Sequence, residues 1–163
     1  MILVECIDTI VSSMSMDVNF EPGLSSQIVR SLILNDESSS FKDKKYPLLA
    51  MLMPVREKRG LGVYALIKID RIIIATLTKS GDNTESVKDR YKTGGTFKDI
   101  LYPCYYEFLD KLAWSGFIAE SDPNALKHDK LDVPGAGGKG IDFIDSIEIL
   151  NLEFNLVTQK ICK

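Results

Sequence analysis

The chain has few of the residues that usually carry chemistry in proteins. It contains one histidine, three cysteines and one tryptophan in 163 residues. The cysteines, Cys6, Cys104 and Cys162, lie far apart and form no CxxC pair. That pattern argues against a zinc site and a disulfide framework, and it suits a reducing compartment. No apolar run approaches the ~18 residues that a membrane span needs. We therefore expect no metal, no cofactor and no membrane contact.

The balance of charge and hydrophobicity is that of an ordinary soluble protein. The formal net charge is -3, and 45% of the residues are hydrophobic. This charge gives no general attraction to nucleic acid. The first residues, MILVECIDTIV, include an acid and no basic cluster, so we expect no signal peptide. The length predicts a single domain over residues 1–163. The N-terminal sequence and the absence of a long apolar run predict an intracellular protein.

The clearest pattern is a helical one at residues 97–112, FKDILYPCYYEFLDKL. Apolar residues recur there at the i, i+3, i+4, i+7 spacing of an amphipathic helix with one buried stripe. The stripe consists of Phe97, Ile100, Leu101, Cys104, Tyr105, Phe108, Leu109 and Leu112. We expect Pro103 to bend this helix near its first turns and Gly116 to end it. The same periodicity predicts a helix over residues 2–14.

Hydrophobic runs elsewhere predict strands. Residues 46–55 are nearly all apolar, which indicates a strand buried on both faces. Residues 63–78 alternate, but the apolar phase shifts by one residue after Arg71, which predicts a β-bulge. Residues 146–157 alternate as a strand with one face in water. The predicted fold class is α+β: a mainly antiparallel sheet with a bulged long strand, covered by the N-terminal helix and the long proline-containing helix.

Shorter segments are predicted from their turn and cap residues. NFEPG at residues 19–23 predicts a turn. For residues 27–34 we favour a short helix, capped by Ser25 or Ser26, over a strand. Thr84 is the expected cap of a further helix.

Two polar segments are expected to be loops. The charged residues 56–59, closed by Gly60, predict a hairpin or loop. Residues 119–142 are rich in proline and glycine and lack apolar periodicity. A stretch of that length and composition predicts a flexible loop.

The tract PGAGGKG at residues 134–140 invites comparison with a phosphate-binding loop. A P-loop needs GxxxxGK followed by Ser or Thr, between a strand and a helix. Here Gly140 follows Lys139, Val133 occupies the position of the earlier glycine, and a strand follows. We therefore expect a flexible or partner-binding loop, not a nucleotide site.

The other polar residues give no catalytic pattern. His128 lies in the polar sequence LKHDK and is expected to be a surface side chain of the loop. Tyr105 belongs to the buried stripe, while Tyr102 or Tyr106 suits a subunit contact better than stacking on nucleic acid. The acidic pairs near the C-terminus lack metal-ligand spacing. We expect no catalytic residue, and a protein that is not an enzyme.

The order of elements resembles a known family from residue 46 to residue 157. The segments that carry the resemblance are KYPLLAML, ALIKIDRIIIATLT, the embedded LYP of the long helix, and SIEILNLEFNLV. In this order they resemble the tail-terminator and tail-completion proteins of tailed bacteriophages. The portion TESVKDRYKTGGTFKDILYPCYYEFLDKL also resembles proteins of Bacteroides phages, including the crAss-like group.

This resemblance implies a structural virion protein, made in the cytoplasm of the host bacterium. It implies a homo-oligomeric ring, six- or twelve-fold, at the neck or tail, as a tail terminator or head–tail connector. Other neck and tail proteins would be its partners, and DNA would pass through the channel without specific binding. Ring contacts need exposed edges and loops. The candidate contact residues are Arg56, Lys58, Arg59, Gly135, Gly137, Gly138 and Lys139.

Two other readings stay open at this point. The chain could be a host-directed phage protein that binds a bacterial partner. It could also be a small ligand-binding α/β domain with a pocket under the long helix, which would require convergent polar groups there. The predicted stripe offers only Cys104 and Tyr105 for that role.

Overall fold

The computed structural model describes residues 2–28, 46–60, 62–77, 87–119, 123–135 and 144–157. Helices and a six-stranded, mostly antiparallel sheet give the predicted α+β class. The elements are α1 (Ile2–Ser12), β1 (Asn19–Leu24), β2 (Leu48–Met53), β3 (Val55–Arg59), β4 (Tyr64–Leu77), α4 (Val87–Arg90), α5 (Tyr102–Trp114), β5 (Lys127–Val133) and β6 (Ile144–Val157).

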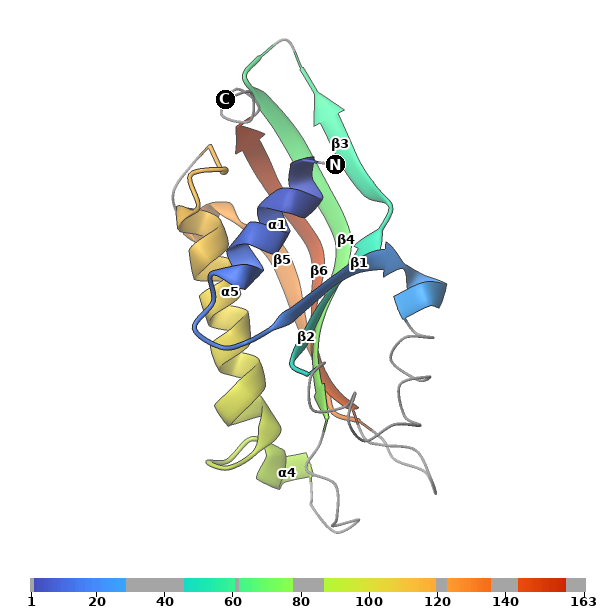
Figure 1. Ribbon diagram of the computed structural model, residues 1–163, viewed down its shortest axis with the longest axis vertical. Helices are drawn as coiled ribbons and strands as arrows, with labels where there is room; N and C mark the ends of the chain where they lie inside the picture. Colours follow the sequence, from blue (N-terminus) through green and yellow to red (C-terminus); the bar gives the residue numbers. More distant parts are fainter. Residues whose placement is uncertain are drawn as a thin grey trace.

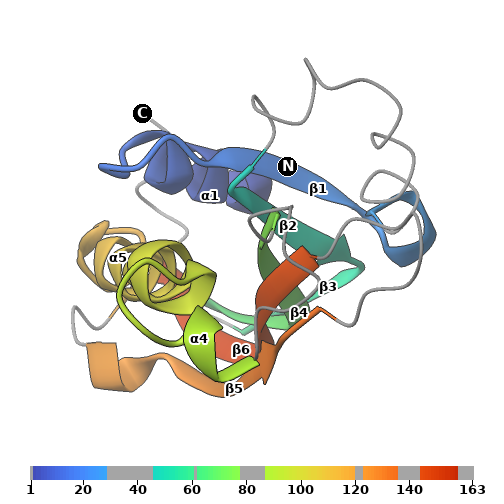
Figure 2. The same cartoon turned by 90° about the horizontal axis from the view of Figure 1, so that it is seen from below.

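The sheet curls around two helices. Its strand order is β1-β2-β4-β6-β5, and β3 pairs with β4 beyond the end of β2. Among the described strands, β1 and β2 form the only parallel pair. Seen end-on, α1 and α5 lie inside the curve, against the concave face (Figure 2). The main core fills this space and includes Ile7 of α1, Phe108 of α5 and Phe154 of β6.

The predicted long helix is confirmed, with an irregular start. Residues 97–101 form a π-helical turn in which the Tyr102 N–H donates to the Phe97 carbonyl, and α5 follows. Pro103 lies in the first turn of α5, directly after this π-helical turn. A proline inside a continuous helix lacks one backbone donor, and helices are commonly irregular at such a residue. Gly116, at φ 74°, follows the last turn, as an αL residue commonly does. The apolar side chains predicted to be buried at residues 97–112 are buried, apart from the partly buried Ile100 and Leu109.

The phase change predicted in the long strand is present. Ile69 and Ile72 are both fully buried, while Asp70 and Arg71 between them are exposed. β6 changes phase at the same level, and Asn151 there has φ 53°. The register between the two strands is kept, with Ile69 opposite Leu152 and Ile72 opposite Ile149. The predicted β-bulge is therefore wrong for the β4–β6 pairing, because both strands change phase together. A register shift is present between β5 and β6, at Lys127 and Asp129.

The predicted turn at 19–23 and much of the predicted loop at 119–142 are wrong because these residues form edge strands. Residues 19–23 belong to β1, where Pro22 is tolerated because an edge strand needs partners on one side only. Of the two alternatives predicted for residues 56–59, the hairpin is confirmed, because these residues belong to β3, one arm of a hairpin with β4. Much of 119–142 is a 3₁₀ turn at Pro123–Ala125 followed by β5. Edge strands expose polar residues on both faces, so apolar alternation does not reveal them.

Other predictions fall partly outside the described residues. Residues 25–28 are helical, as predicted, but the rest of 27–34 lies outside the described ranges. So does Thr84, although α4 follows it. β2 is confirmed as a buried strand, and Pro47 and Pro54 flank it.

Candidate functional site

A row of charged side chains crosses the convex face of the sheet. Directly opposite residues on antiparallel strands point to the same face. Arg56 of β3 lies opposite Lys68 of β4, Lys68 lies opposite Glu153 of β6, and Glu153 lies opposite Lys127 of β5. Lys58 stands beside this row, opposite Leu66. We call the cations Arg56, Lys58, Lys68 and Lys127 the basic patch.

Acidic side chains neutralise only part of the basic patch. Lys68 Nζ donates to Glu153 Oε1 at 2.5 Å, and Arg56 pairs with Asp70. The hydrogen bond from Lys68 and its charge lower the pKa of Glu153. Lys58 is exposed and forms no salt bridge with another residue in the described part of the chain. The patch thus keeps an excess of positive charge on a protein whose net charge is negative.

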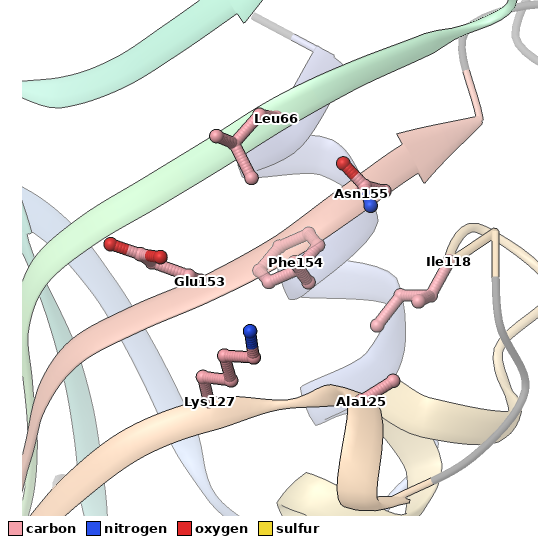
Figure 3. Close-up of a pocket in the computed structure, with 7 residues that line it drawn as sticks. All are labelled: Leu66, Ile118, Ala125, Lys127, Glu153, Phe154 and Asn155. Atoms are coloured by element: carbon pink, nitrogen blue, oxygen red, sulfur yellow. The ribbon is translucent and has the colours of Figure 1, made fainter.

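A small hollow adjoins the basic patch (Figure 3). Its volume is about 90 Å³, well below the roughly 300–1,000 Å³ of small-molecule sites. The residues that line it are Leu66, Ile118, Ala125, Lys127, Glu153, Phe154 and Asn155. The hollow lies between β6 and β5 and not under α5, so it does not match the pocket of the ligand-binding reading.

The outer side of α5 carries large exposed aromatic side chains. Tyr106 is 63% exposed and Trp114 is 61% exposed. The exposed Asp110 lies one turn from each of them, because residues four apart share one side of a helix. We call Tyr106, Asp110 and Trp114 the aromatic stripe. Exposed Trp and Tyr side chains of this kind are typical of binding surfaces.

A polar seam next to the aromatic stripe joins α5 to β5. The Tyr105 hydroxyl lies 2.7 Å from His128 Nε2, and the Tyr102 hydroxyl donates to Asp132 Oδ2 at 2.7 Å. Lys130 Nζ lies 4.5 Å from the centre of the Tyr102 ring. His128, predicted as a loop residue on the surface, is therefore half-buried in a strand. The seam explains how a strand with little apolar character is held against the helix.

Alkaline pH should weaken the region around α5. Burial raises the pKa of Tyr105 and of Tyr102, and the hydrogen bond to Asp132 raises that of Tyr102 further. Burial also raises the pKa of the Cys104 thiol from 9.0 to about 12. Folded-state pKa values above the unfolded ones favour folding while the groups are protonated. This stability is complete below about pH 9 and is lost as the pH rises toward 12.

The measurement is the fall of the thermal midpoint across that range, together with the ultraviolet absorbance of tyrosinate. We expect part of the tyrosinate signal to appear well above pH 10, and Tyr102→Phe to reduce that late part. If every tyrosine of the folded protein titrates together near its ordinary pKa of 10.0, the seam is not as described.

A buried carboxylate organises the end of the sheet opposite the basic patch. Asp145 of β6 is fully buried and accepts hydrogen bonds from Arg90 Nη1 at 2.6 Å and Thr96 Oγ1 at 2.5 Å. It also accepts one from the Gly135 N–H at 2.8 Å. Arg90 Nη1 donates to the Gly135 carbonyl as well. The carboxylate thus joins α4, the residue before the π-helical turn, the segment just after β5 and the start of β6.

The structure brings together only some of the predicted contact residues. Arg56, Lys58 and Arg59 share β3, and Arg59 pairs with Glu57 at 2.6 Å. Gly135 lies beside Asp145, at the other end of the sheet. Gly137, Gly138 and Lys139 lie outside the described residues. Sequence reasoning had offered Tyr102 or Tyr106 for a subunit contact and did not consider Trp114, although its spacing from Tyr106 was visible.

Two wider properties complete the description. Among the described residues, no group of three or more His, Cys, Asp or Glu side chains is placed to hold a metal ion. Within the same ranges, none of the helices combines the length and apolar character that crossing a membrane requires. Comparisons of the chain with protein-family models, with curated proteins and with solved structures give no significant match.

Proposed function

We propose that this protein is a structural component of a tailed-phage virion, which assembles as a ring at the neck or tail around the DNA channel. The observation that carries the proposal is the β3–β4 hairpin. It extends to one end of the molecule, away from α4 (Figure 1). Among the described strands, β3 hydrogen-bonds to β4 alone, so its outer edge is available for a neighbour.

The exposed side chains of this hairpin suit a subunit contact. Tyr64 is 53% exposed and Leu66 is 39% exposed, both on β4 beside the cations of β3. Apolar side chains within a charged rim are typical of surfaces that bind another protein. A ring requires such a surface on one side of each subunit and a different one on the other. The aromatic stripe supplies a second, different surface.

The overall charge agrees with this role. A channel that lets DNA pass must not hold its phosphates, and phosphate binding needs an excess of Lys and Arg. The chain has 20 Lys and Arg against 23 Asp and Glu. The proposed protein acts by assembly, without an enzymatic step. It is made in the host bacterial cytoplasm and contacts other neck or tail proteins.

Counting copies in purified phage particles that encode the chain tests this function. We expect quantitative mass spectrometry to give a fixed ratio of one-half or one copy per portal subunit, as for a six- or twelve-fold ring. Absence from the particle would rule out the virion role. Recovery of one stoichiometric partner from host lysate would then favour the host-directed reading.

A further inference from the structure

We propose that the aromatic stripe of one copy binds the basic patch of the next copy, so that the subunits join head to tail. This inference rests on the proposed ring and names its contact. The occupant of the stripe is a second copy of this chain. The argument comes from the charges, the spacing and the positions of the two surfaces.

The two surfaces have complementary chemistry. The stripe places the exposed Asp110 between Tyr106 and Trp114. A Lys or Arg that enters such a site can pair with the carboxylate and lie over an aromatic face. The basic patch offers Lys58, whose neighbours Arg56 and Lys68 are already paired. Leu66, opposite Lys58, gives the rings an apolar surface to cover.

The helical layer adds to this complementarity. Glu5 and Asp8 are exposed on α1, which has no Lys or Arg. Glu107 of α5 is held by the Ser15 N–H at 2.6 Å, which ties the end of α1 to α5. On α1 and α5 the acids Glu5, Asp8, Glu107 and Asp110 outnumber the one base, Lys111, whose Nζ lies 3.9 Å from Glu107 Oε1. The helices therefore carry a negative balance of charge, and the basic patch carries a positive one. Opposite potentials of this kind orient two partners before they touch.

The spacing of the two surfaces also agrees. Tyr106, Asp110 and Trp114 are four residues apart along α5, which is about 6 Å per step. Tyr64, Leu66 and Lys68 are two residues apart along β4, which is about 6.8 Å per step. A helix laid along this hairpin can thus match its side chains to those of the strand over the length of the stripe.

The positions of the surfaces favour a head-to-tail contact. Both views place α5 on one flank of the molecule and β3 on the opposite flank (Figures 1 and 2). The two surfaces of one copy therefore point away from each other and must be satisfied by different neighbours. Repeating such a heterologous contact closes into a ring when the rotation per subunit divides a full turn.

A charge swap tests the contact. Lys58→Glu and Asp110→Lys should each weaken self-association at least about tenfold, because like charges then face each other. The double variant should regain association, and so should a mixture of the two single variants. Lys92→Glu makes the same charge change as Lys58→Glu on an exposed residue that follows α4, and it should associate like wild type. Figure 1 shows α4 and β3 at opposite ends of the molecule.

Tryptophan fluorescence can follow the association of the copies. Trp114 is the one tryptophan of the chain, so its emission should shift to the blue when copies associate and stay red in the single variants. Sedimentation up to about millimolar concentration gives the affinity in parallel. Far-ultraviolet circular dichroism and thermal midpoints verify that each variant is folded.

The outcomes separate the contact from the function. Wild-type oligomers that survive both reversals, or that leave Trp114 emission unshifted, overturn this contact but not the ring. A wild-type chain that stays monomeric over the whole concentration range also overturns it as a self-contact. The ring itself is judged by the copy number in the particle, which does not depend on these variants.

Discussion

Replacing Asp145 with alanine should lower the free energy of unfolding by about 3–5 kcal/mol, the usual cost of breaking a buried ion pair. Asp145 is 0% exposed and Arg90 is 6% exposed, so the Arg90 guanidinium would lose its carboxylate in a place that water barely reaches. The Thr96 hydroxyl and the Gly135 N–H would lose the same acceptor. Urea denaturation of the two proteins measures the difference.

A second substitution shows whether charge is the cause. Replacing both partners, Arg90→Met with Asp145→Leu, should recover part of the loss, because no charge then stays buried. Asp129→Ala removes an exposed carboxylate from β5 and should change stability by no more than about 0.5 kcal/mol. A loss below about 1 kcal/mol for Asp145→Ala would mean that water reaches this carboxylate in the folded protein.

Replacing Phe108 with alanine should cost about 3–5 kcal/mol, which combines lost burial with the cavity left behind. Phe108 is 0% exposed and lies on α5 in the middle of the main core. Helices and strands surround this position, so the space cannot close by a simple shift of one loop. The midpoint of urea denaturation should fall while its slope stays the same.

Tyr106→Ala is the matched control on the same helix. Its side chain is 63% exposed, so truncation should change stability by no more than about 0.5 kcal/mol. If the aromatic stripe binds a second copy, this variant should instead weaken self-association. Equal destabilisation by Phe108→Ala and Tyr106→Ala would contradict the assigned orientation of α5.

The parts of the fold that sequence predicted well are those that bury one regular face. The stripe from Phe97 to Leu112 and the apolar run of β2 follow the periods of a helix and of a doubly buried strand. The phase change at Asp70 and Arg71 was visible for the same reason. In each case hydrophobic burial alone determines the spacing of the apolar residues, and that spacing can be read from a single sequence.

The parts that sequence missed are held by polar contacts between distant residues. β5 is fixed by hydrogen bonds to β6 and by His128 and Asp132, which meet tyrosines of α5. Such pairings have no periodic signature, because each depends on a partner at least 13 residues away. The basic patch was predicted only on β3 for the same reason. Lys68 and Lys127 join it through strand register.

The matched phase change in β4 and β6 has a consequence for how this sheet can evolve. Deleting one residue at Asp70 or Arg71 alone would slide β4 against β6 and turn buried isoleucines outward. Deleting Asp70 and Asn151, which lie opposite each other, would leave the remaining β4–β6 pairs in place. Related sequences should therefore gain or lose residues in β4 and β6 together. An insertion near Asp70 should be accompanied by an insertion about eighty residues later, near Asn151.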